Sequence, residues 1–392
     1  MPEDTYIKFV TEHDGDDPGR LLLSANQWPG VDVRRAARNI AARARIRTKI
    51  PSWYAHPELE YLGSLPLEQA SSEATALYKQ QFVPAGARIA DLTGGLGVDC
   101  WFLSQRAAEA HYCELKSELV AAARHNFAAL SRADIEIHEG SGTQWLLEQS
   151  ETFDLIYLDP ARRGAGQRRV YDISDCEPNL LEIKDMLLAK SSRTLAKISP
   201  MADISRTLEQ FPETRELHVV AVAGEVKELL LLLEDSAKEE PLIVAHDILG
   251  GGAHHFEFHP QQEPAAEVRY AGRIGKFLFQ PSKVILKAGA FRLLSKRFGL
   301  EKLAPSTHLY TADTIPEGFP GKVFEVETTF EWSKDALRRL KQSYDRMEMT
   351  ALNFPLATDT LRKKTRLAGG GSRHLFATTL ADKSKKLIIC RF

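Results

Sequence analysis

Apolar side chains recur along the chain with two different periods, and the change of period marks the first predicted boundary. In the stretch VRRAARNIAARARIRTKI, the residues Val33, Ala37, Ile40 and Ala44 follow the spacing of a helix. A proline-rich segment follows, and then a second helical stretch, LEQASSEATALYKQQF, which a proline ends. We therefore expect residues 1–85 to form a helical N-terminal extension.

From about residue 86, short apolar runs alternate with segments of helical length. The predicted parallel strands are, in chain order, 87–92, 109–115, 134–140, 153–159 and 193–199, and a helix follows each of them. Helix-length crossovers join parallel strands and place helices on both faces of the sheet. Two further strands, 216–223 and 227–234, are separated by only a few residues and therefore form an antiparallel hairpin. The pattern predicts an α/β fold with a Rossmann-like, doubly wound sheet of seven strands within residues 86–238.

The regular alternation ends near residue 238, and two small α+β units are predicted beyond it. The first spans residues 239–319 and combines strand-like segments with a helix at 282–300 and a strand at 307–313. The second spans residues 320–392. Its predicted strands are 322–330, 349–355, 374–380 and 385–392, and its predicted helices are 333–347 and 358–368. The chain is therefore expected to have four parts, of which the sheet domain is the largest.

The charge of the chain is balanced overall but uneven along its length. The formal net charge is -2, so the chain as a whole is not a polycation. From Arg34 to Lys49 there are seven basic residues and no acidic one, and residues 320–392 hold 15 basic and 8 acidic residues. Such segments fit either a local binding site for a polyanion or an ordinary solvated surface. Each segment alone leaves both interpretations open.

Cysteine usage and hydropathy indicate a cytoplasmic protein. The four cysteines form no CxxC pair and no zinc-binding spacing, which favours a reducing compartment. The N-terminus is acidic and lacks an apolar core, so we expect no signal peptide. No uninterrupted apolar stretch approaches the roughly 20 residues of a membrane span. We accordingly expect neither a membrane partner nor a metal cofactor.

Polar residues stand at the ends of four successive predicted strands. They are Asp91, Glu114, Ser141 and Asp159, and a glycine-rich turn follows the first of them. Open sheets bind ligands at the carboxyl ends of their strands, so these residues predict a ligand site. The sequence ADLTGGLGVD lacks the third glycine of the dinucleotide pattern, and its acid would repel a pyrophosphate. A cationic ligand fits the site better.

The pattern Asp-x-(Gly/Thr)-x-Gly-x-Gly resembles the first motif of class I S-adenosylmethionine-dependent methyltransferases, with a threonine in place of the first glycine. The resemblance implies S-adenosyl-L-methionine as the cofactor. It also implies that Glu114 binds the ribose hydroxyls and that Gly140 and Ser141 bracket the adenine. The expected cofactor-binding residues are Asp91, Thr93, Gly94, Gly95, Gly97, Asp99, Glu114, Gly140, Ser141 and Glu73. Glu73 would meet the methionine amine, and its alternative role is that of an exposed residue at a helix cap.

The stretch LDPARRG ends the fourth strand. Methyltransferases that act on nucleic acids or planar amines carry (Asn/Asp/Ser)-Pro-Pro-(aromatic) here, which implies that Asp159 orients the acceptor. In this chain an alanine and Arg162 replace the second proline and the aromatic residue. A guanidinium can stack on a base or clamp a phosphate, so Asp159 and Arg162 are the expected catalytic residues. Alternatively, Arg162 and Arg163 form a solvated loop paired with acids such as Asp172 and Asp175.

Over nearly its whole length, the chain resembles a narrower group of bacterial class I methyltransferases. Members of this group have a ferredoxin-like unit, here residues 239–319, followed by a THUMP-like domain, here residues 320–392. The resemblance rests on LEQASSEATALYK, DLTGGLGVD, LDPARR, SKVILKAGAFRLLSKRFGL with THLYTAD, and NFPLATDTLRKKTRLAGGGSRHLFATT. Because THUMP domains bind RNA, it implies an RNA substrate. The basic cluster Arg362, Lys363, Lys364 and Arg366 agrees with RNA binding, and Arg373 and Lys386 extend the same surface.

Three chemistries compete for the acceptor site. Methylation of an exocyclic amine of a base needs little beyond Asp159, and it is the favoured function. Ribose 2′-O methylation needs lysines and carboxylates that activate a hydroxyl, and a partial set exists in Lys79, Asp159, Lys197 and either Glu225 or Glu228. Methylation of pyrimidine carbon 5 needs a cysteine nucleophile, which the end of the fifth strand, KISPM, lacks.

Two further alternatives concern the substrate and the presence of catalysis itself. A methyltransferase could act on a substrate other than RNA, and that alternative predicts no salt-sensitive RNA affinity. An RNA-binding module without catalysis is disfavoured, because degenerate methyltransferases usually lose the glycine turn or the acid of the fourth strand. Both features are intact in this chain.

Overall fold

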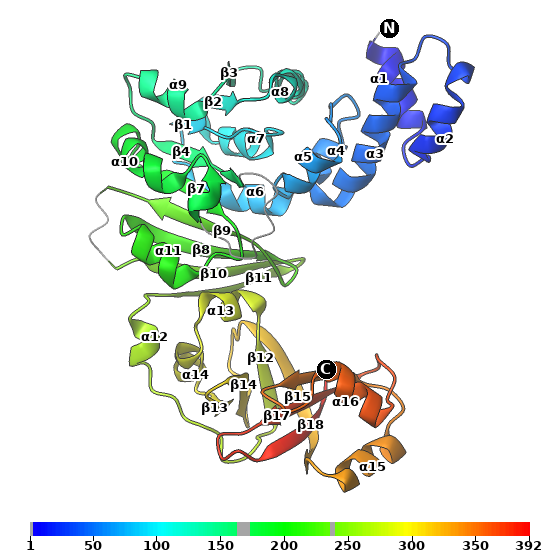
Figure 1. The fold of residues 1–392 in the computed structure, drawn as a ribbon, viewed down its shortest axis with the longest axis vertical. Helices are drawn as coiled ribbons and strands as arrows, with labels where there is room; N and C mark the ends of the chain where they lie inside the picture. The colour runs from blue at the N-terminus through cyan, green and yellow to red at the C-terminus, as the bar shows by residue number, and fades with distance from the viewer. Residues whose placement is uncertain (1–2, 163–172, 236–239) are drawn as a thin grey trace. The chain divides into compact units, whose positions relative to one another are not determined.

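The computed structural model describes residues 3–162, 173–235 and 240–392 of the chain, which divides into two compact units (Figure 1). One unit lies within residues 1–217 and 228–239, and the other lies within residues 218–227 and 240–392. The division passes through β8 (Thr214–Val222) and β9 (Glu225–Leu233), each of which contributes residues to both units.

The N-terminal segment is helical, as predicted. Its helices are α1 (Glu3–Glu12), α2 (Pro18–Leu23), α3 (Val33–Lys49), α4 (Pro51–Tyr54), α5 (Ser64–Gln69) and α6 (Glu73–Lys79), with 3-10 turns at Ala25–Gln27 and Gln80–Phe82. The predicted buried face of α3 is confirmed at Val33, Ala37 and Ile40, which are buried. The prediction is wrong at Ala44, which is exposed. The second half of α3 packs Ile46 into a separate apolar cluster, so the buried stripe shifts around the helix. No helix of the described residues is long and apolar enough to cross a membrane.

Four of the seven basic residues between Arg34 and Lys49 bind to other parts of the N-terminal segment. The contacts are Arg35 with Glu60, Arg43 with Asp14 at 3.2 Å, Arg45 with Glu68 at 2.8 Å, and Lys49 with the carbonyl oxygens of Leu67 and Glu68. These side chains stabilise the packing of the unit itself. The contacts support the interpretation of a structural helix surface over that of a polyanion site.

Five parallel strands form the centre of the large sheet. They are β1 (Ala87–Asp91), β2 (Ala107–Glu114), β3 (Glu136–Glu139), β4 (Leu155–Leu158) and β7 (Thr194–Ile198). β9 runs antiparallel to β7 with β8 beside it, and the order β8-β9-β7-β4-β1-β2-β3 confirms the predicted seven-stranded arrangement. Two strands that the sequence pattern did not assign to this sheet, β10 (Leu242–Leu249) and β11 (Gly252–Phe258), follow β8 in the hydrogen-bonded order. They bring the sheet to nine strands.

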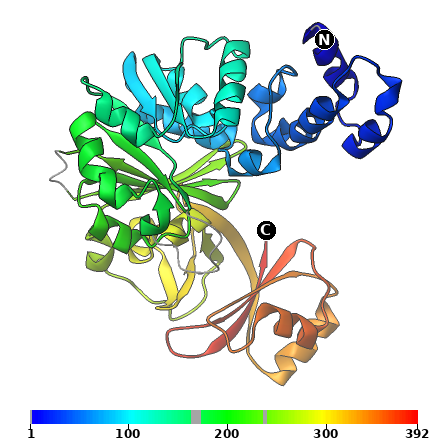
Figure 2. The same ribbon diagram turned by 45° about the horizontal axis from the view of Figure 1, so that its top comes forward.

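Helices cover both faces of the parallel strands. α7 (Val98–Ser104) and α8 (Ser117–Ala129) lie on one side, and α9 (Gly142–Glu148) and α10 (Leu180–Lys190) lie on the other (Figure 1 and Figure 2). This double cover explains why all four residues of β4 are buried. α9 begins so close to the end of β1 that a Cβ atom at Gly142 would lie 2.4 Å from the carbonyl oxygen of Leu92. The first helical position after β3 therefore accommodates only glycine.

The remaining elements of the sheet domain surround the ends of β4 and β7. They are the short antiparallel pair β5 (Ala161–Arg162) and β6 (Cys176–Glu177), the 3-10 turn Ile173–Asp175, and α11 (Ile204–Gln210). Arg162 and Cys176 are register partners in the short pair. The backbone beyond Asp159 thus turns away from the large sheet, as the proline at position 160 predicts.

The second unit contains a seven-stranded sheet with the order β13-β14-β12-β15-β18-β17-β16. Its strands are β12 (Phe277–Pro281), β13 (Glu301–Ala304), β14 (Thr307–Ala312), β15 (Gly321–Glu331), β16 (Glu348–Leu352), β17 (Arg373–Thr379) and β18 (Lys385–Arg391). Its helices are α12 (Gln262–Ala265), α13 (Lys283–Ala288), α14 (Arg292–Phe298), α15 (Lys334–Ser343) and α16 (Thr358–Thr365). The single helix predicted at 282–300 is wrong, because Gly289 takes a left-handed conformation with φ of 83° and ends α13.

Candidate active site

The turn after β1 is shaped by two glycines that no other residue could replace without movement. A Cβ atom at Gly94 would lie 2.0 Å from the ring of Tyr112, and one at Gly97 would lie 2.6 Å from Phe127. Gly97 also has a φ of 81°, in the left-handed region that glycine favours. The hydroxyl of Tyr112 donates to the carbonyl oxygen of Gly95 at 2.6 Å. The turn is thus packed tightly against β2 and held in one conformation.

Thr93, which replaces a glycine of the first methyltransferase motif, joins the ends of two strands. Its backbone N–H donates to the carboxylate of Asp91 at 3.0 Å. Its hydroxyl oxygen accepts the backbone N–H of Asp159 at 2.6 Å. A glycine at this position could not make the second bond. The threonine that departs from the motif therefore fixes the distance between Asp91, which ends β1, and Asp159, which follows β4.

Acidic groups converge around this turn. Asp91 is fully buried, and its burial raises the pKa of its carboxyl group well above the ordinary range. The nearby charges of Asp99, Asp159 and Glu114 raise this pKa further, against the opposing effect of the Thr93 N–H. The site is consequently a region of negative potential, and a cationic ligand would relieve the repulsion between the carboxylates.

Glu114, at the end of β2, is half-buried and oriented by two backbone donors. Its two carboxylate oxygens accept from the N–H groups of Gly95 and Lys116, each at 2.9 Å. A carboxylate can accept about four hydrogen bonds, so capacity for two hydroxyl groups remains. The N–H of Gly140 donates to the Glu114 carbonyl oxygen at 2.9 Å, and Ser141 caps α9. The sequence-predicted residues at the ends of β2 and β3 therefore lie together.

Glu73 makes contacts that favour its alternative, structural role. Its carboxylate accepts from the backbone N–H of Ser52 at 2.7 Å and from the Ser52 hydroxyl at 2.8 Å. These bonds tie the first turn of α6 to the first turn of α4. The carboxylate oxygen that makes them is engaged in helix packing, which weighs against the expected contact with a methionine amine.

Asp99 takes part in a buried network of charges. The Asp99 carboxylate accepts from the hydroxyls of Ser71 at 2.7 Å and Tyr157 at 2.8 Å, and from the ammonium of Lys79 at 3.1 Å. Lys79 is completely buried, and its ammonium also donates to Glu228 at 3.0 Å. Sequence reasoning missed Tyr157. The signal was available, since Tyr157 lies two residues before Asp159 in an extended segment, a spacing that places side chains on one face.

Lys197 continues this network to Asp159. The Lys197 ammonium lies 2.5 Å from the Asp159 carboxylate. Burial alone would lower the pKa of Lys197, but the carboxylates of Asp159, Asp99 and Glu228 raise it overall, so this lysine stays protonated. Burial raises the pKa of Glu228, against the influence of the two lysines. The structure thus brings together the whole set of Lys79, Asp159, Lys197 and Glu228.

Glu225, the other candidate for this set, lies elsewhere. Its carboxylate is exposed and pairs with Lys227 at 2.8 Å. For Arg162 the structure describes the backbone alone, and Arg163 and Asp172 lie outside the described residues. The expected contact between the substrate and these arginines therefore stays a prediction.

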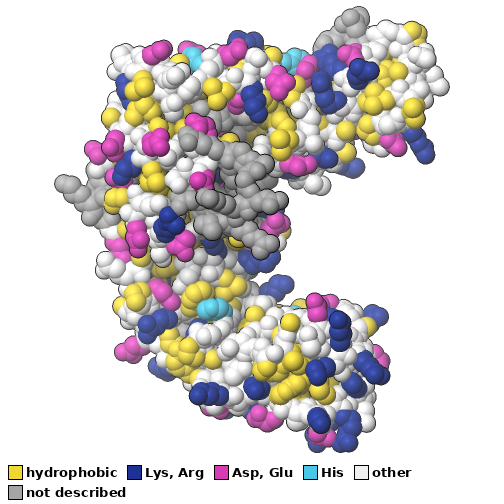
Figure 3. Space-filling view, viewed as in Figure 1, with side chains coloured by type: hydrophobic (Ala, Val, Ile, Leu, Met, Phe, Trp, Pro, Cys, Tyr) yellow, Lys and Arg dark blue, Asp and Glu magenta, His cyan; other side chains and the backbone are white. Residues whose placement is uncertain are grey.

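The predicted RNA-binding residues lie on and just after α16. Figure 3 shows Lys and Arg side chains gathered over the region that Figure 1 draws as α15 and α16. Lys363, Lys364 and Arg366 are exposed, whereas Arg362 is half-buried and lies 3.8 Å from Glu348. Arg373 and Lys386, which are predicted to extend this surface, form ion pairs with acidic residues. Arg373 pairs with Glu327 at 2.7 Å, and Lys386 pairs with Glu331. Of the predicted set, Lys363, Lys364 and Arg366 are thus the exposed basic side chains, and their contact with RNA stays a prediction.

Comparisons with known proteins agree with this architecture. A family model described as a ferredoxin-like domain matches residues 277–320, and one described as THUMP domain-like matches residues 321–391. The crystal structure of a proposed methyltransferase from Porphyromonas gingivalis W83 is similar with a TM-score of 0.91 and 36% identity, over 99% of this chain and 97% of that one. The chain is also similar to two uncharacterized S-adenosylmethionine-dependent methyltransferases of Mycobacterium tuberculosis, from strains CDC 1551 and H37Rv. Each is 26% identical over 311 residues, which cover 77% of this chain and 80% of the relative.

Removing one member of the buried pair Lys79–Glu228 is expected to destabilise the fold. The substitution Glu228→Gln leaves a buried ammonium without its full charge balance, which lowers the free energy of unfolding by about 3–5 kcal/mol. Urea denaturation followed by circular dichroism measures this change. Glu225→Gln on the same strand is the matched control, and it should unfold like the wild type because Glu225 is exposed. Equal stability of both variants would contradict the structural importance of the network.

Proposed function

We propose that this chain, which belongs to the methyltransferase family of the Porphyromonas gingivalis protein, transfers a methyl group from S-adenosyl-L-methionine to RNA. The observation that carries the proposal is the convergence of Asp91, Glu114 and Asp159 around a tightly packed glycine turn. These carboxylates belong to three neighbouring strands of one parallel sheet. Their negative potential suits a ligand that bears a sulfonium and an ammonium group.

The described residues fit the cofactor by the chemistry of their donors and acceptors. S-adenosyl-L-methionine supplies an electrophilic methyl group. Glu114 is oriented by backbone N–H groups and can accept two hydroxyl hydrogen bonds from a ribose. Asp91 and the turn at Gly94 and Gly95 would hold the positively charged part of the ligand, and Gly140 and Ser141 would flank its base. The ordered turn allows these groups to bind without reorganisation.

The acceptor is held at Asp159, and its chemistry follows from the contact with Lys197. An amine acceptor gains positive charge during methylation, and a protonated lysine beside its orienting carboxylate disfavours that charge. A hydroxyl acceptor must lose its proton, and the ammonium of Lys197 stabilises the negative charge that develops on its oxygen. The free oxygen of Asp159 can accept the hydroxyl proton. We therefore place ribose 2′-O methylation ahead of the exocyclic amine favoured by sequence reasoning.

RNA as the substrate class is supported by two features of the C-terminal part. Residues 321–391 match the THUMP-like family model, and domains of the THUMP class bind RNA. Lys363, Lys364 and Arg366 form an exposed basic group at the end of α16. Lysine and arginine contacts with phosphates dominate the affinity of proteins for nucleic acids, and they make it depend on salt.

Glu114 is expected to contribute strongly to cofactor affinity. Glu114→Ala removes charge-assisted hydrogen bonds to the ribose, and it should weaken S-adenosyl-L-methionine binding by about tenfold to a hundredfold. Isothermal titration calorimetry measures the dissociation constant. Glu118→Ala, an exposed acid at the start of α8, is the control that should bind like the wild type. If Glu114→Ala binds with wild-type affinity, the ribose assignment is wrong, whatever the acceptor proves to be.

Lys197→Met distinguishes the hydroxyl acceptor from the amine, and Asp159→Ala tests the acceptor site itself. Asp159→Ala should abolish methyl transfer in either case and leave cofactor affinity within a few-fold of wild type. Lys197→Met keeps the length of the side chain and removes its charge, and it should lower the rate about a hundredfold for a hydroxyl acceptor. For an amine acceptor it should change the rate only slightly. The assay uses total RNA from cells that lack the protein, and mass spectrometry of the nucleosides identifies the methylated atom. An N-methyl product would replace the hydroxyl proposal with the amine one.

The basic group on α16 is expected to contact RNA phosphates. The double variant Lys363→Gln/Lys364→Gln should weaken RNA binding and reduce the slope of log affinity against log salt by about 2. Fluorescence anisotropy with a labelled RNA measures both quantities. The control Lys8→Gln/Arg20→Gln removes the same charge from exposed positions of α1 and α2. Equal salt slopes in the two double variants would show that α16 is not the RNA contact.

A further inference from the structure

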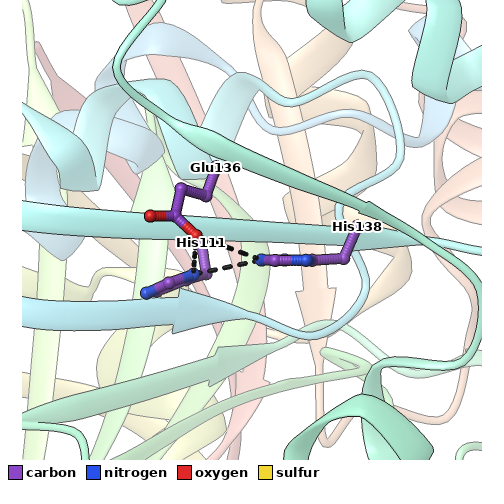
Figure 4. A group of neighbouring side chains, drawn as sticks. All are labelled: His111, Glu136 and His138. Carbon is purple, nitrogen blue, oxygen red and sulfur yellow. Dashed lines mark hydrogen bonds and ion pairs between the residues drawn. The ribbon is translucent and has the colours of Figure 1, made fainter.

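Two neighbouring parallel strands repeat the same short pattern, Glu-x-His. It occurs as Glu109-Ala110-His111 in β2 and as Glu136-Ile137-His138 in β3. Alternate residues of a strand point to the same face, and His111 lies opposite Glu136 in the register of the pair. Three of these side chains, His111, Glu136 and His138, therefore point toward one another (Figure 4). The repeat contains no cysteine, so the spacing of the cysteines does not reveal it.

The distances between the three side chains are those of ligands around one small ion. The Nδ1 atom of His111 lies 3.1 Å from Nε2 of His138 and 3.5 Å from a carboxylate oxygen of Glu136. The same oxygen lies 4.0 Å from Nε2 of His138. Ligands on a tetrahedral zinc ion with bonds of about 2.0–2.2 Å are about 3.3–3.6 Å apart. Adjustments of a few tenths of an ångström bring all three atoms to a common centre.

The surroundings hold the histidines in a state that can bind a metal. The second nitrogen of His111 contacts the carboxylate of Glu109 at 2.6 Å, which favours the proton on that nitrogen and makes Nδ1 an acceptor. Trp145 stacks on His138 with ring centroids 4.4 Å apart, and Phe153 contacts His111 edge-on. These contacts restrict the motion of both rings.

One hydrogen bond links the two histidine rings, and Glu136 makes only long contacts with them. With the proton of His111 directed at Glu109, the only hydrogen bond open between the rings runs from His138 to His111. The Glu136 oxygen then remains 3.5 and 4.0 Å from the two ring nitrogens, too far for strong bonds. One divalent ion would replace this single hydrogen bond with three ligand bonds.

We propose that His111, His138 and Glu136 bind one zinc ion, with Glu109 as the carboxylate that orients His111. Two imidazoles and a carboxylate suit zinc, and water would complete the tetrahedron. The ion joins β3, the last strand in the sheet order, to β2. His138, one of its ligands, lies two residues before Gly140. The ion would therefore order the end of β3, where the adenine is expected to bind. This inference departs from the expectation that the chain has no metal, and it does not depend on methyl transfer.

The test uses the full chain without a histidine tag, stripped with a chelator and then dialysed. Zinc is titrated by calorimetry, and cobalt(II) is added in a second experiment because a tetrahedral site gives it intense visible absorption. We expect one ion per chain, a dissociation constant at least tenfold higher in Glu136→Gln, and still weaker binding in His138→Gln. Glu109→Gln should weaken binding by about tenfold to a hundredfold. Glu118→Gln is the control that should bind like the wild type.

Thermal unfolding supplies a second readout. Glu136 is largely exposed, so Glu136→Gln should fold and melt like the wild type in the presence of chelator. Added zinc should raise the melting temperature of the wild type and leave that of Glu136→Gln and His138→Gln nearly unchanged. The proposal is overturned if the wild type shows no saturable zinc binding. It is also overturned if the two ligand variants bind zinc with wild-type affinity, which would locate the ion elsewhere.

Discussion

The arrangement of the candidate active site depends on the ion pairs of one buried ammonium group, that of Lys79. Moving an ion from water into a protein interior costs several kcal/mol, and the cost is offset only when charged partners lie in good geometry. Lys79 meets this condition through Asp99 of α7 and Glu228 of β9, which is 149 residues further along the chain. The helix before the sheet, the first helix within it and the strand beyond β7 must therefore all be in place together.

Lys197 extends the same constraint to the acceptor side. Its ammonium is surrounded by the carboxylates of Asp159, Asp99 and Glu228, and they keep it protonated in spite of its burial. Asp159 is held from the other direction by the hydroxyl of Thr93. The acid at which the acceptor is proposed to bind is thus fixed by one cation and one backbone hydrogen bond. Preorganisation of this kind is the main contribution that a protein makes to an in-line transfer reaction.

Much of the fold and the general position of the site could be predicted from the sequence. Acids such as Asp91, Glu114 and Asp159 end predicted strands, and parallel strands bring their carboxyl ends to one edge, so their convergence follows from periodicity. The antiparallel pairing of β9 beside the parallel strands followed from the short connection before it. Local pattern was sufficient in these cases because the interactions lie along single elements.

The errors arose where the outcome depends on tertiary contacts. The helix predicted at 282–300 is interrupted because Gly289, which costs a helix only about 1 kcal/mol, instead takes a left-handed conformation that ends α13. Ala44 is exposed because the second half of α3 faces a different cluster from the first. The expected cofactor contact of Glu73 stays a prediction. Its carboxylate binds Ser52 of α4, and no local pattern indicates this contact.

Proton and charge balance distinguishes the two acceptor chemistries more sharply than the fold does. The Lys79, Lys197, Asp99, Asp159 and Glu228 side chains place two cations among three anions, so the network carries one formal negative charge when all are ionised. Asp91 and Glu114 add to the negative potential toward the expected cofactor. The sulfonium and the ammonium of the cofactor offset part of that excess, and Lys197 would be the cation beside the acceptor. A hydroxyl that loses its proton to Asp159 uses both members of this pair, whereas a neutral amine would use the carboxylate alone and oppose the lysine. The proposed methylation of a hydroxyl would make use of both Lys197 and Asp159, whereas methylation of an amine would not require the lysine.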